Sequence, residues 1–405
     1  MPGHHIRLIW RHDPILYAPA KYRRACAYDA FIPDPLADLP FALDAATAGL
    51  VSDAERAIHA LNSERSDVLA PLARLLLRTE SISSSRVEGI AVGARAMARA
   101  ASRAESGLRV GATALEVLDN VNAMRAAMDA ASAQSRFTTA DIVGIHRLVM
   151  AHATGRHVAG QVRTVQNWIG GNDYNPCGAD FVPPPPERVH PLLEDLTDAV
   201  SREDLPPLVQ AALVHAQFES IHPFEDGNGR TGRALVQVVL RRRGIAPHYV
   251  PPISVILAAD RDTYIAGLGR FRFGDPVRWV AEFAEAAARA AALASRYLTA
   301  VRDLQEQWRR RLAAGPNPRT DAAAWAVIDA LPAHPVISAA DAIADTGRAP
   351  SAVHAAVRQL VDAGVLIPLS GSKRNRLWEA AGLLELVEGL EAGRPPSQAD
   401  IASTS

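Results

Sequence analysis

Apolar residues recur every three or four positions over most of the chain, which is the spacing of one face of an α-helix. Ser52 or Asp53 is expected to cap the first helix, and Thr138 or Thr139 is expected to cap the helix that ends near residue 150. Helices are predicted within residues 53–77, 111–150 and 253–283, and one long helix over roughly 277–313. The chain is therefore predicted to be mainly α-helical.

Two stretches depart from this spacing. Residues 1–50 are interrupted by prolines and have no clear period, so we expect irregular or short elements there. Residues 160–186 contain two crudely alternating runs, 161–169 and 179–182, separated by a Gly-Gly-Asn-Asp turn and ended by four prolines. This pattern predicts a β-hairpin, and a loop that only covers the core is the alternative.

The end of the long helix marks a domain boundary. Gly315-Pro-Asn-Pro318 stops the helical pattern, and residues 319–390 then read as a helix, a helix-turn-helix pair and a hairpin. That order is typical of a winged helix. Residues 391–405 are polar, so we expect a disordered tail.

Two functions fit the region 319–390. The positive charges of Lys373, Arg374 and Arg376 in its hairpin could bind DNA phosphate. Its third helix, however, has only His354 and Arg358 as polar side chains that could contact DNA bases. Because these are few polar and basic side chains for a DNA-binding module, we favour a role in protein docking or dimerisation.

Composition narrows the class of protein. The 405 residues are 48% hydrophobic, enough for a large core, and 43 basic residues balance 44 acidic ones. This balance gives no general argument for binding nucleic acid or membranes. The two cysteines are too few for a disulfide framework or a zinc site, and neither a signal peptide nor a membrane-spanning run is apparent. We expect a soluble, cytoplasmic protein.

Glycines and ionisable side chains are concentrated in residues 222–233, which read His-Pro-Phe-Glu-Asp-Gly-Asn-Gly-Arg-Thr-Gly-Arg. Gly227 and Gly229 flank Asn228, an arrangement in which backbone N–H groups can converge on a phosphate. Helical spacing resumes directly afterwards, so the turn is predicted to be a helix N-terminus, where free N–H groups favour an anion.

Charged side chains surround this turn. Arg230 and Arg233 are three residues apart and can fork onto phosphate oxygens. Asp226 supplies the oxygen ligand that Mg²⁺ needs beside a polyphosphate, and His222 can take a proton near neutral pH. The glycines also spell G-x-G-x-x-G, but the preceding residues are helical, which excludes a dinucleotide site. No P-loop occurs, and an ordinary polar turn would leave this set of charged residues unexplained.

Residues 222–233 match the full signature of the Fic family, H-P-F-x-[D/E]-G-N-G-R-x-x-R, at every fixed position. The resemblance implies a helical fold and transfer of a nucleoside monophosphate, usually AMP from ATP, to a protein hydroxyl. It implies His222 and Arg233 as catalytic residues and Asp226 as the Mg²⁺ ligand. The nucleotide-binding residues would be Phe224, Gly227, Asn228, Gly229, Arg230, Arg233 and Tyr264. The segment 160–186 would be a flap that docks the target protein by strand addition.

A second motif resembles the inhibitory pattern of this family, [S/T]-x-x-x-E-[G/N], at Ser84, Glu88 and Gly89. Glu88 would form a forked ion pair with Arg233 and occupy the position of the γ-phosphate. A serine cluster followed by Glu-Gly is also typical of a helix end, which is the simpler interpretation.

The predicted architecture is a Fic-type helical bundle with a β-hairpin flap and a small C-terminal winged helix. Its expected regions are 1–95 with the inhibitory helix, 96–314 as the catalytic core, 319–390, and 391–405. Self-modification and homodimerisation fit the sequence. The alternatives are removal of AMP by the same site, transfer of another group such as phosphate or phosphocholine, and a nucleotide-sensing DNA-binding regulator.

Overall fold

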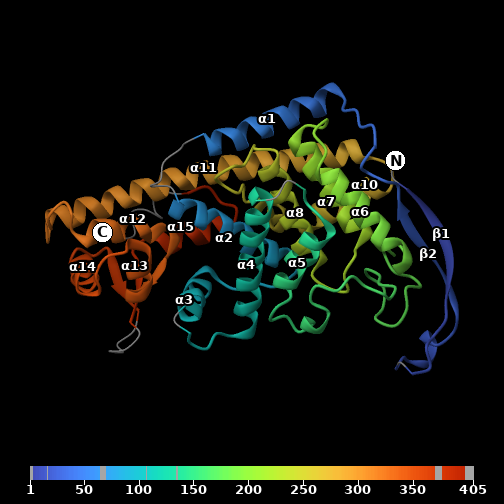
Figure 1. Cartoon of the computed structure of the whole chain (residues 1–405), viewed down its shortest axis with the longest axis horizontal. Helices are drawn as coiled ribbons and strands as arrows, with labels where there is room; N and C mark the ends of the chain where they lie inside the picture. Colours follow the sequence, from blue (N-terminus) through green and yellow to red (C-terminus); the bar gives the residue numbers. More distant parts are fainter. Residues whose placement is uncertain are drawn as a thin grey trace. The chain divides into compact units, whose positions relative to one another are not determined.

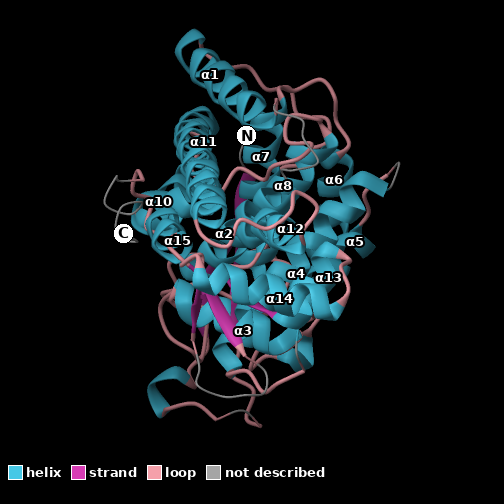
Figure 2. Ribbon diagram, turned by 90° about the vertical axis from the view of Figure 1, so that its left-hand side faces the viewer, coloured by secondary structure: helices cyan, strands magenta, loops and turns pink. Residues whose placement is uncertain are grey.

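The computed structural model describes residues 3–15, 17–63, 70–105, 107–133, 136–369 and 376–396. Helices dominate these residues, as predicted, and two small antiparallel sheets accompany them (Figures 1 and 2). By their packing, residues 1–55, 123–245 and 261–285 form a first unit, and residues 56–122, 246–260 and 286–405 form a second. None of the described helices is both long and apolar enough to cross a membrane.

Two buried helices form the centre of the first unit. In α7 (Pro207–Ile221) every residue from Leu208 onward is buried, and α8 (Asn228–Arg242) is buried from Asn228 to Leu240. Gly232 brings these helices close together, because a Cβ there would lie 2.6 Å from Oε1 of Glu219. The unit also contains α5 (Thr139–Val149), α6 (Val189–Val200) and α10 (Arg261–Arg272).

The N-terminal region differs from the prediction of irregular or short elements for 1–50. It contains a hairpin of two eight-residue strands, β1 (Gly3–Trp10) and β2 (Cys26–Pro33), which pair from Gly3 opposite Pro33 to Trp10 opposite Cys26 (Figure 1). The connection between the strands is long rather than a tight turn, which hid the pairing from the sequence pattern.

The segment 160–186 is less regular than the predicted hairpin. Its only strand-like pairing among the described residues is one antiparallel bridge between Ile169 and Phe181. The Ile169 N–H donates to the Phe181 carbonyl at 2.8 Å, and the Asp180 N–H donates to the Ile169 carbonyl at 2.9 Å. Four prolines and several glycines disfavour a longer ladder.

Helix boundaries follow their caps. Thr138 caps α5 through a capping box with Asp141, as predicted. In contrast, α1 (Ala45–Asn62) begins well before Ser52, because the Asp44 carboxylate accepts a hydrogen bond from the Thr47 N–H at 2.8 Å. That bond holds the pKa of Asp44 below its usual value.

The second unit holds the remaining helices. The long α11 ends at the Gly-Pro boundary, as predicted, whereas α3 had no counterpart in the sequence analysis. The unit contains α2 (Ala70–Val87), α3 (Ala94–Glu105) and α9 (Ile253–Ala259), and α4 (Ala112–Ala133) and α11 (Pro276–Ala314) contribute residues to both units.

The C-terminal elements follow the predicted order of helix, helix pair and hairpin. The helices are α12 (Ala323–Ala330), α13 (Ala339–Thr346), α14 (Pro350–Asp362) and α15 (Leu383–Glu391). The strands β3 (Val336–Ser338), β4 (Leu366–Pro368) and β5 (Leu377–Ala380) form a sheet of order β3-β5-β4. The winged-helix assignment and the expected domain boundaries remain predictions.

Candidate nucleotide-binding site

Residues 222–233 form the turn between α7 and α8 and the first helical turns of α8. His222 ends α7 in a left-handed conformation, with φ 49°, and Gly227 precedes α8 with φ 75°. A side chain at Gly227 would be strained, and its Cβ would lie 2.8 Å from Sδ of Met150. As predicted, the glycine turn is the N-terminus of a helix, whose first N–H groups have no partner within the helix and favour an anion.

The side chain of Asn228 holds the turn together. Its Oδ1 accepts from the Phe224 N–H at 2.9 Å, and its Nδ2 donates to the Phe224 carbonyl at 2.8 Å. Thr231 adds a hydroxyl bond to the Gly227 carbonyl at 2.9 Å. Asn228 therefore shapes the turn through its side chain, and only its backbone is left to face a phosphate.

His146 supports the turn from α5, a role that the sequence analysis did not identify. Its ring stacks on Phe224 with 3.7 Å between centroids. Nδ1 accepts from the Gly160 N–H at 3.0 Å, so Nε2 carries the hydrogen and donates to the Asp226 carbonyl at 2.9 Å. Burial lowers the pKa of His146 to about 4, which keeps the ring neutral.

The flap fixes the backbone of His222. Arg163 Nε donates to the His222 carbonyl at 2.9 Å, and Nδ2 of Asn167 donates to the same carbonyl at 3.3 Å and to the Phe224 carbonyl at 3.0 Å. Arg163 is only 3% exposed and bonds further carbonyls at Val165 and Pro184. Both residues lie more than 50 positions before the motif, so its spacing gave no signal for them.

His222 and Asp226 differ in the exposure of their side chains. The His222 side chain is 18% exposed, and its Nδ1 lies 3.9 Å from Oε2 of Glu219. The Asp226 side chain is 59% exposed, and its Oδ1 accepts from the Gly227 N–H at 2.6 Å. The described residues include no group of three His, Cys, Asp or Glu side chains placed to hold a metal. A single carboxylate still fits Mg²⁺ held mainly by phosphate oxygens and water.

The two arginines of the motif are buried and have different neighbours. Nη2 of Arg230 lies 4.0 Å from Oδ1 of Asp226 and 3.6 Å from Sδ of Met150. Arg233 lies near His215, whose pKa falls to about 3 through burial first and the Arg233 charge second. The Arg230 guanidinium therefore lies between Asp226 and Met150, whereas the Arg233 charge acts on His215.

Two aromatic residues predicted to touch the nucleotide are packed inside the protein. Phe224 is fully buried between His146 and Phe218, so it anchors the turn. Tyr264 is 6% exposed, and its hydroxyl lies 2.9 Å from Nε2 of His215. Any contribution of Tyr264 to base binding would therefore come from its ring.

Known proteins match this chain in sequence and in fold. The model of the Fic/DOC family matches residues 136–240, and that of the Fic/DOC family N-terminal region matches residues 48–129. Residues 48–129 and 136–240 therefore carry the two sequence regions of the Fic/DOC family.

Two relatives illustrate the extent of the match. The protein adenylyltransferase fic-1 of Caenorhabditis elegans is 28% identical over 290 residues, which cover 68% of this chain and 54% of the relative. The protein adenylyltransferase Fic of Nematostella vectensis is 36% identical over 154 residues, 36% of this chain and 32% of the relative. This chain thus spans about half or less of the curated relatives it matches.

A solved structure supports the fold alone. A Fic family protein from Desulfovibrio desulfuricans has a TM-score of 0.52 and 21% identity, over 85% of this chain and 98% of that chain. The β1–β2 hairpin lies before both segments that the Fic family models match.

The motif predicted to be inhibitory lies in the second unit, at the end of α2. Ser84 is buried within the helix, whereas Glu88 and Gly89 follow it and are exposed. Gly89 has φ 78°, and the Ile90 N–H donates to the Ser85 carbonyl at 3.1 Å, so the sequence Glu-Gly does end a helix. The simpler interpretation of Glu88 and Gly89 as a helix end is thus confirmed, and the inhibitory role of Glu88 stays a prediction.

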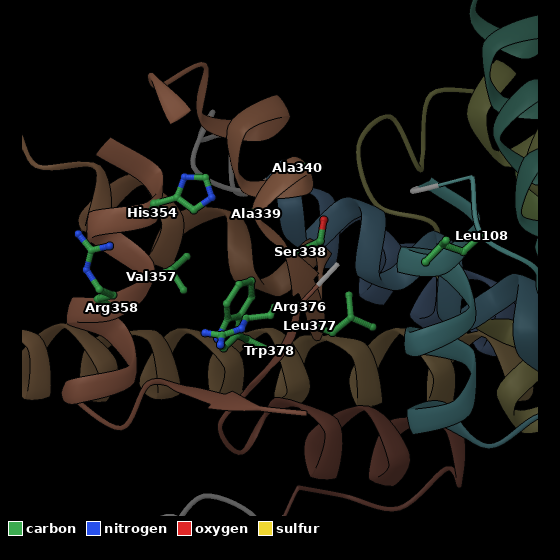
Figure 3. A pocket seen from close by; sticks show the side chains of 10 residues that line it. All are labelled: Leu108, Ser338, Ala339, Ala340, His354, Val357, Arg358, Arg376, Leu377 and Trp378. Carbon is green, nitrogen blue, oxygen red and sulfur yellow. The ribbon is translucent and has the colours of Figure 1, made fainter. Parts of the chain in front are cut away.

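The polar residues behind the DNA-binding alternative line a cavity of about 400 Å³ in the second unit (Figure 3). His354 and Arg358 reach it from α14, and Arg376 and Trp378 from the β5 side, while Val357 adds an apolar wall. Lys373 and Arg374 lie outside the described residues. DNA binding by 319–390 stays a prediction.

Proposed function

We propose that this Fic protein transfers AMP from ATP to a Ser, Thr or Tyr hydroxyl of a protein. The observation that carries the proposal is the convergence of His222, Asp226 and the first turn of α8 around one glycine turn. Similar relatives are named protein adenylyltransferases, which favours AMP transfer over the other reactions considered.

In the proposed reaction His222 takes the proton from the attacking hydroxyl. The hydroxyl oxygen forms a bond to the α-phosphorus while the bond between that phosphorus and the β-phosphate bridging oxygen breaks, and pyrophosphate leaves. The N–H groups at Gly227, Asn228 and Gly229 would hold phosphate oxygens, and Arg230 and Arg233 would neutralise the β- and γ-phosphates. Asp226 would hold Mg²⁺, which supplies further charge neutralisation when bound.

The flap would hold the target. Residues 160–186 contact the backbone of His222 through Arg163 and Asn167, which supports a segment that places a hydroxyl beside the imidazole. Backbone pairing with an extended target segment would provide position with little side-chain selectivity. Self-modification is a special case of this docking.

We also propose that Glu88 inhibits transfer by pairing with Arg233, so that ATP binds in a pose unsuited to in-line attack. The test is incubation of Glu88→Gly with α-labelled ATP and Mg²⁺, followed by mass spectrometry. Protein-bound AMP should rise above the wild-type level and vanish in Glu88→Gly/His222→Ala. Label that persists without His222 would refute the assignment, and label unaffected by Glu88→Gly would refute the inhibition.

A further inference from the structure

The β1–β2 hairpin is joined covalently to the flap. Cys26, the first residue of β2, forms a disulfide with Cys177, which lies in the flap between Ile169 and Phe181. The bond spans 151 residues of sequence and uses both cysteines of the chain. Both cysteines are partly exposed, so a small thiol can reach the bond.

Further contacts between described residues supplement this bond. The Asn175 side-chain amide donates to the Tyr22 carbonyl at 3.3 Å, and the Phe31 and Phe181 rings lie 6.0 Å apart. The Phe31 N–H donates to the Val182 carbonyl at 2.9 Å, and Tyr22 stacks on Tyr174 with 5.1 Å between centroids. Trp10 meets Trp168 edge-on at 5.5 Å. Aromatic pairs of this kind add only modestly to stability beyond the burial of their rings, and a two-stranded hairpin is marginally stable by itself.

A cavity of about 650 Å³ separates the two segments between these attachment points. Tyr28 and Asp29 line it from β2, and Gly178, Asp180 and Phe181 line it from the flap. The disulfide therefore ties the flap to the hairpin at one end of this open space.

The flap also reaches the catalytic turn. Phe181 lies over the guanidinium of Arg272, with Cζ 3.7 Å from the ring centroid. Arg272 in turn donates to the Glu219 carbonyl at 3.0 Å and to the Ser220 hydroxyl at 3.3 Å, just before His222. The position of the flap is thus linked to the backbone just before His222 through Arg272, which contacts both.

We propose that the Cys26–Cys177 disulfide is a redox switch that orders the flap and thereby controls docking of the protein target. A dithiol reductant would give two electrons and two protons, break the S–S bond to two thiols and become a disulfide itself. The hairpin and the flap tip then separate, whereas the turn 222–233, which contains no cysteine, keeps its nucleotide contacts. The effect of reduction on target docking rests on the proposed function. The claim that the disulfide orders the flap is independent of that function.

The experiment compares oxidised and dithiol-treated Glu88→Gly protein by hydrogen–deuterium exchange, ATP titration and self-labelling with α-labelled ATP. Reduction should raise exchange in 3–33 and 168–182 by roughly tenfold or more and lower self-labelling by about fivefold. The ATP dissociation constant should stay within about twofold.

The matched control is Cys26→Ser/Cys177→Ser in the same background, which should behave like the reduced protein and ignore the dithiol. Since the chain has no other thiol, any remaining response would be unspecific. Equal exchange in the two redox states overturns the switch, and altered exchange with equal self-labelling overturns its control of docking. Absence of labelling in both states refutes the proposed function, while exchange still decides whether the disulfide orders the flap.

Discussion

Hydrogen bonds from the flap hold the backbone of His222. Its left-handed conformation turns the carbonyl toward Arg163 and Asn167 of the flap, so the imidazole depends on residues far away in sequence. A non-glycine residue in this region of φ costs about 1–3 kcal/mol, which surrounding bonds must offset.

Arg163 should be necessary for this placement. Arg163→Lys keeps the charge but cannot fork onto several carbonyls, and we expect AMP transfer by Glu88→Gly to fall by about 10–100-fold. The measurement is the rate of label transfer at saturating ATP. Arg188→Ala, at an exposed position near the end of the flap, is the control and should keep the full rate. A fully active Arg163→Lys would show that the flap does not position His222.

Asp226 should be responsible for any effect of Mg²⁺ on ATP affinity. Asp226→Asn retains an oxygen for the Gly227 N–H, so the turn should persist while the charge that holds Mg²⁺ is lost. We expect Mg²⁺ to strengthen ATP binding about tenfold in the parent protein and not at all in the variant. Titration of ATP with and without Mg²⁺ measures this, and Glu225→Gln, its exposed neighbour, should respond like the parent. A variant that still responds to Mg²⁺ would remove Asp226 from the metal site.

At the scale of elements, the sequence predicts the helix ends that are set by residues close by in the chain. The Thr138 cap, the end of α11 and the start of α8 all follow from a cap, a Gly-Pro stop or a glycine turn within a few residues. The β1–β2 hairpin and the support of the site by His146 and Arg163 depend on partners tens of residues away. No periodicity in a single sequence encodes such pairings, although Ile6, Leu8 and Trp10 do alternate.

The packing of α7 on α8 should tolerate no side chain at Gly232. A Cβ there would lie 2.6 Å from Oε1 of Glu219 and 2.9 Å from the Phe218 ring, so Gly232→Ala should destabilise the protein by about 1–3 kcal/mol. Gly144→Ala in α5 meets nothing within 4 Å and should instead stabilise it by about 0.5–1 kcal/mol. Urea unfolding of both variants measures these signs. Equal effects in the two would contradict the close approach of the helices.

Over the whole molecule, buried ionisable groups link stability to pH in opposing senses. Burial lowers the pKa of His146 to about 4 and that of His215 to about 3, so the unfolded chain binds more protons than the folded one between these values and about 6.5. Burial raises the pKa of Glu55 and Glu391, so the folded chain binds their protons first. Acidification therefore costs stability through the histidines and restores some through the glutamates.

The histidine contribution can be isolated by substitution. Between pH 7 and pH 5, the free energy of unfolding should fall by roughly 2 kcal/mol through His146 alone. His146→Asn removes that titration, so its loss over the same interval should be smaller than that of the parent by about this amount, whatever its stability at pH 7. Urea unfolding at both pH values gives the difference, and His190→Asn, at an exposed position on α6, should leave it unchanged. If His146→Asn lost as much stability as the parent on acidification, the ring would not be held neutral between Gly160 and Asp226, and the support it gives the glycine turn would have to come from its stacking on Phe224 alone.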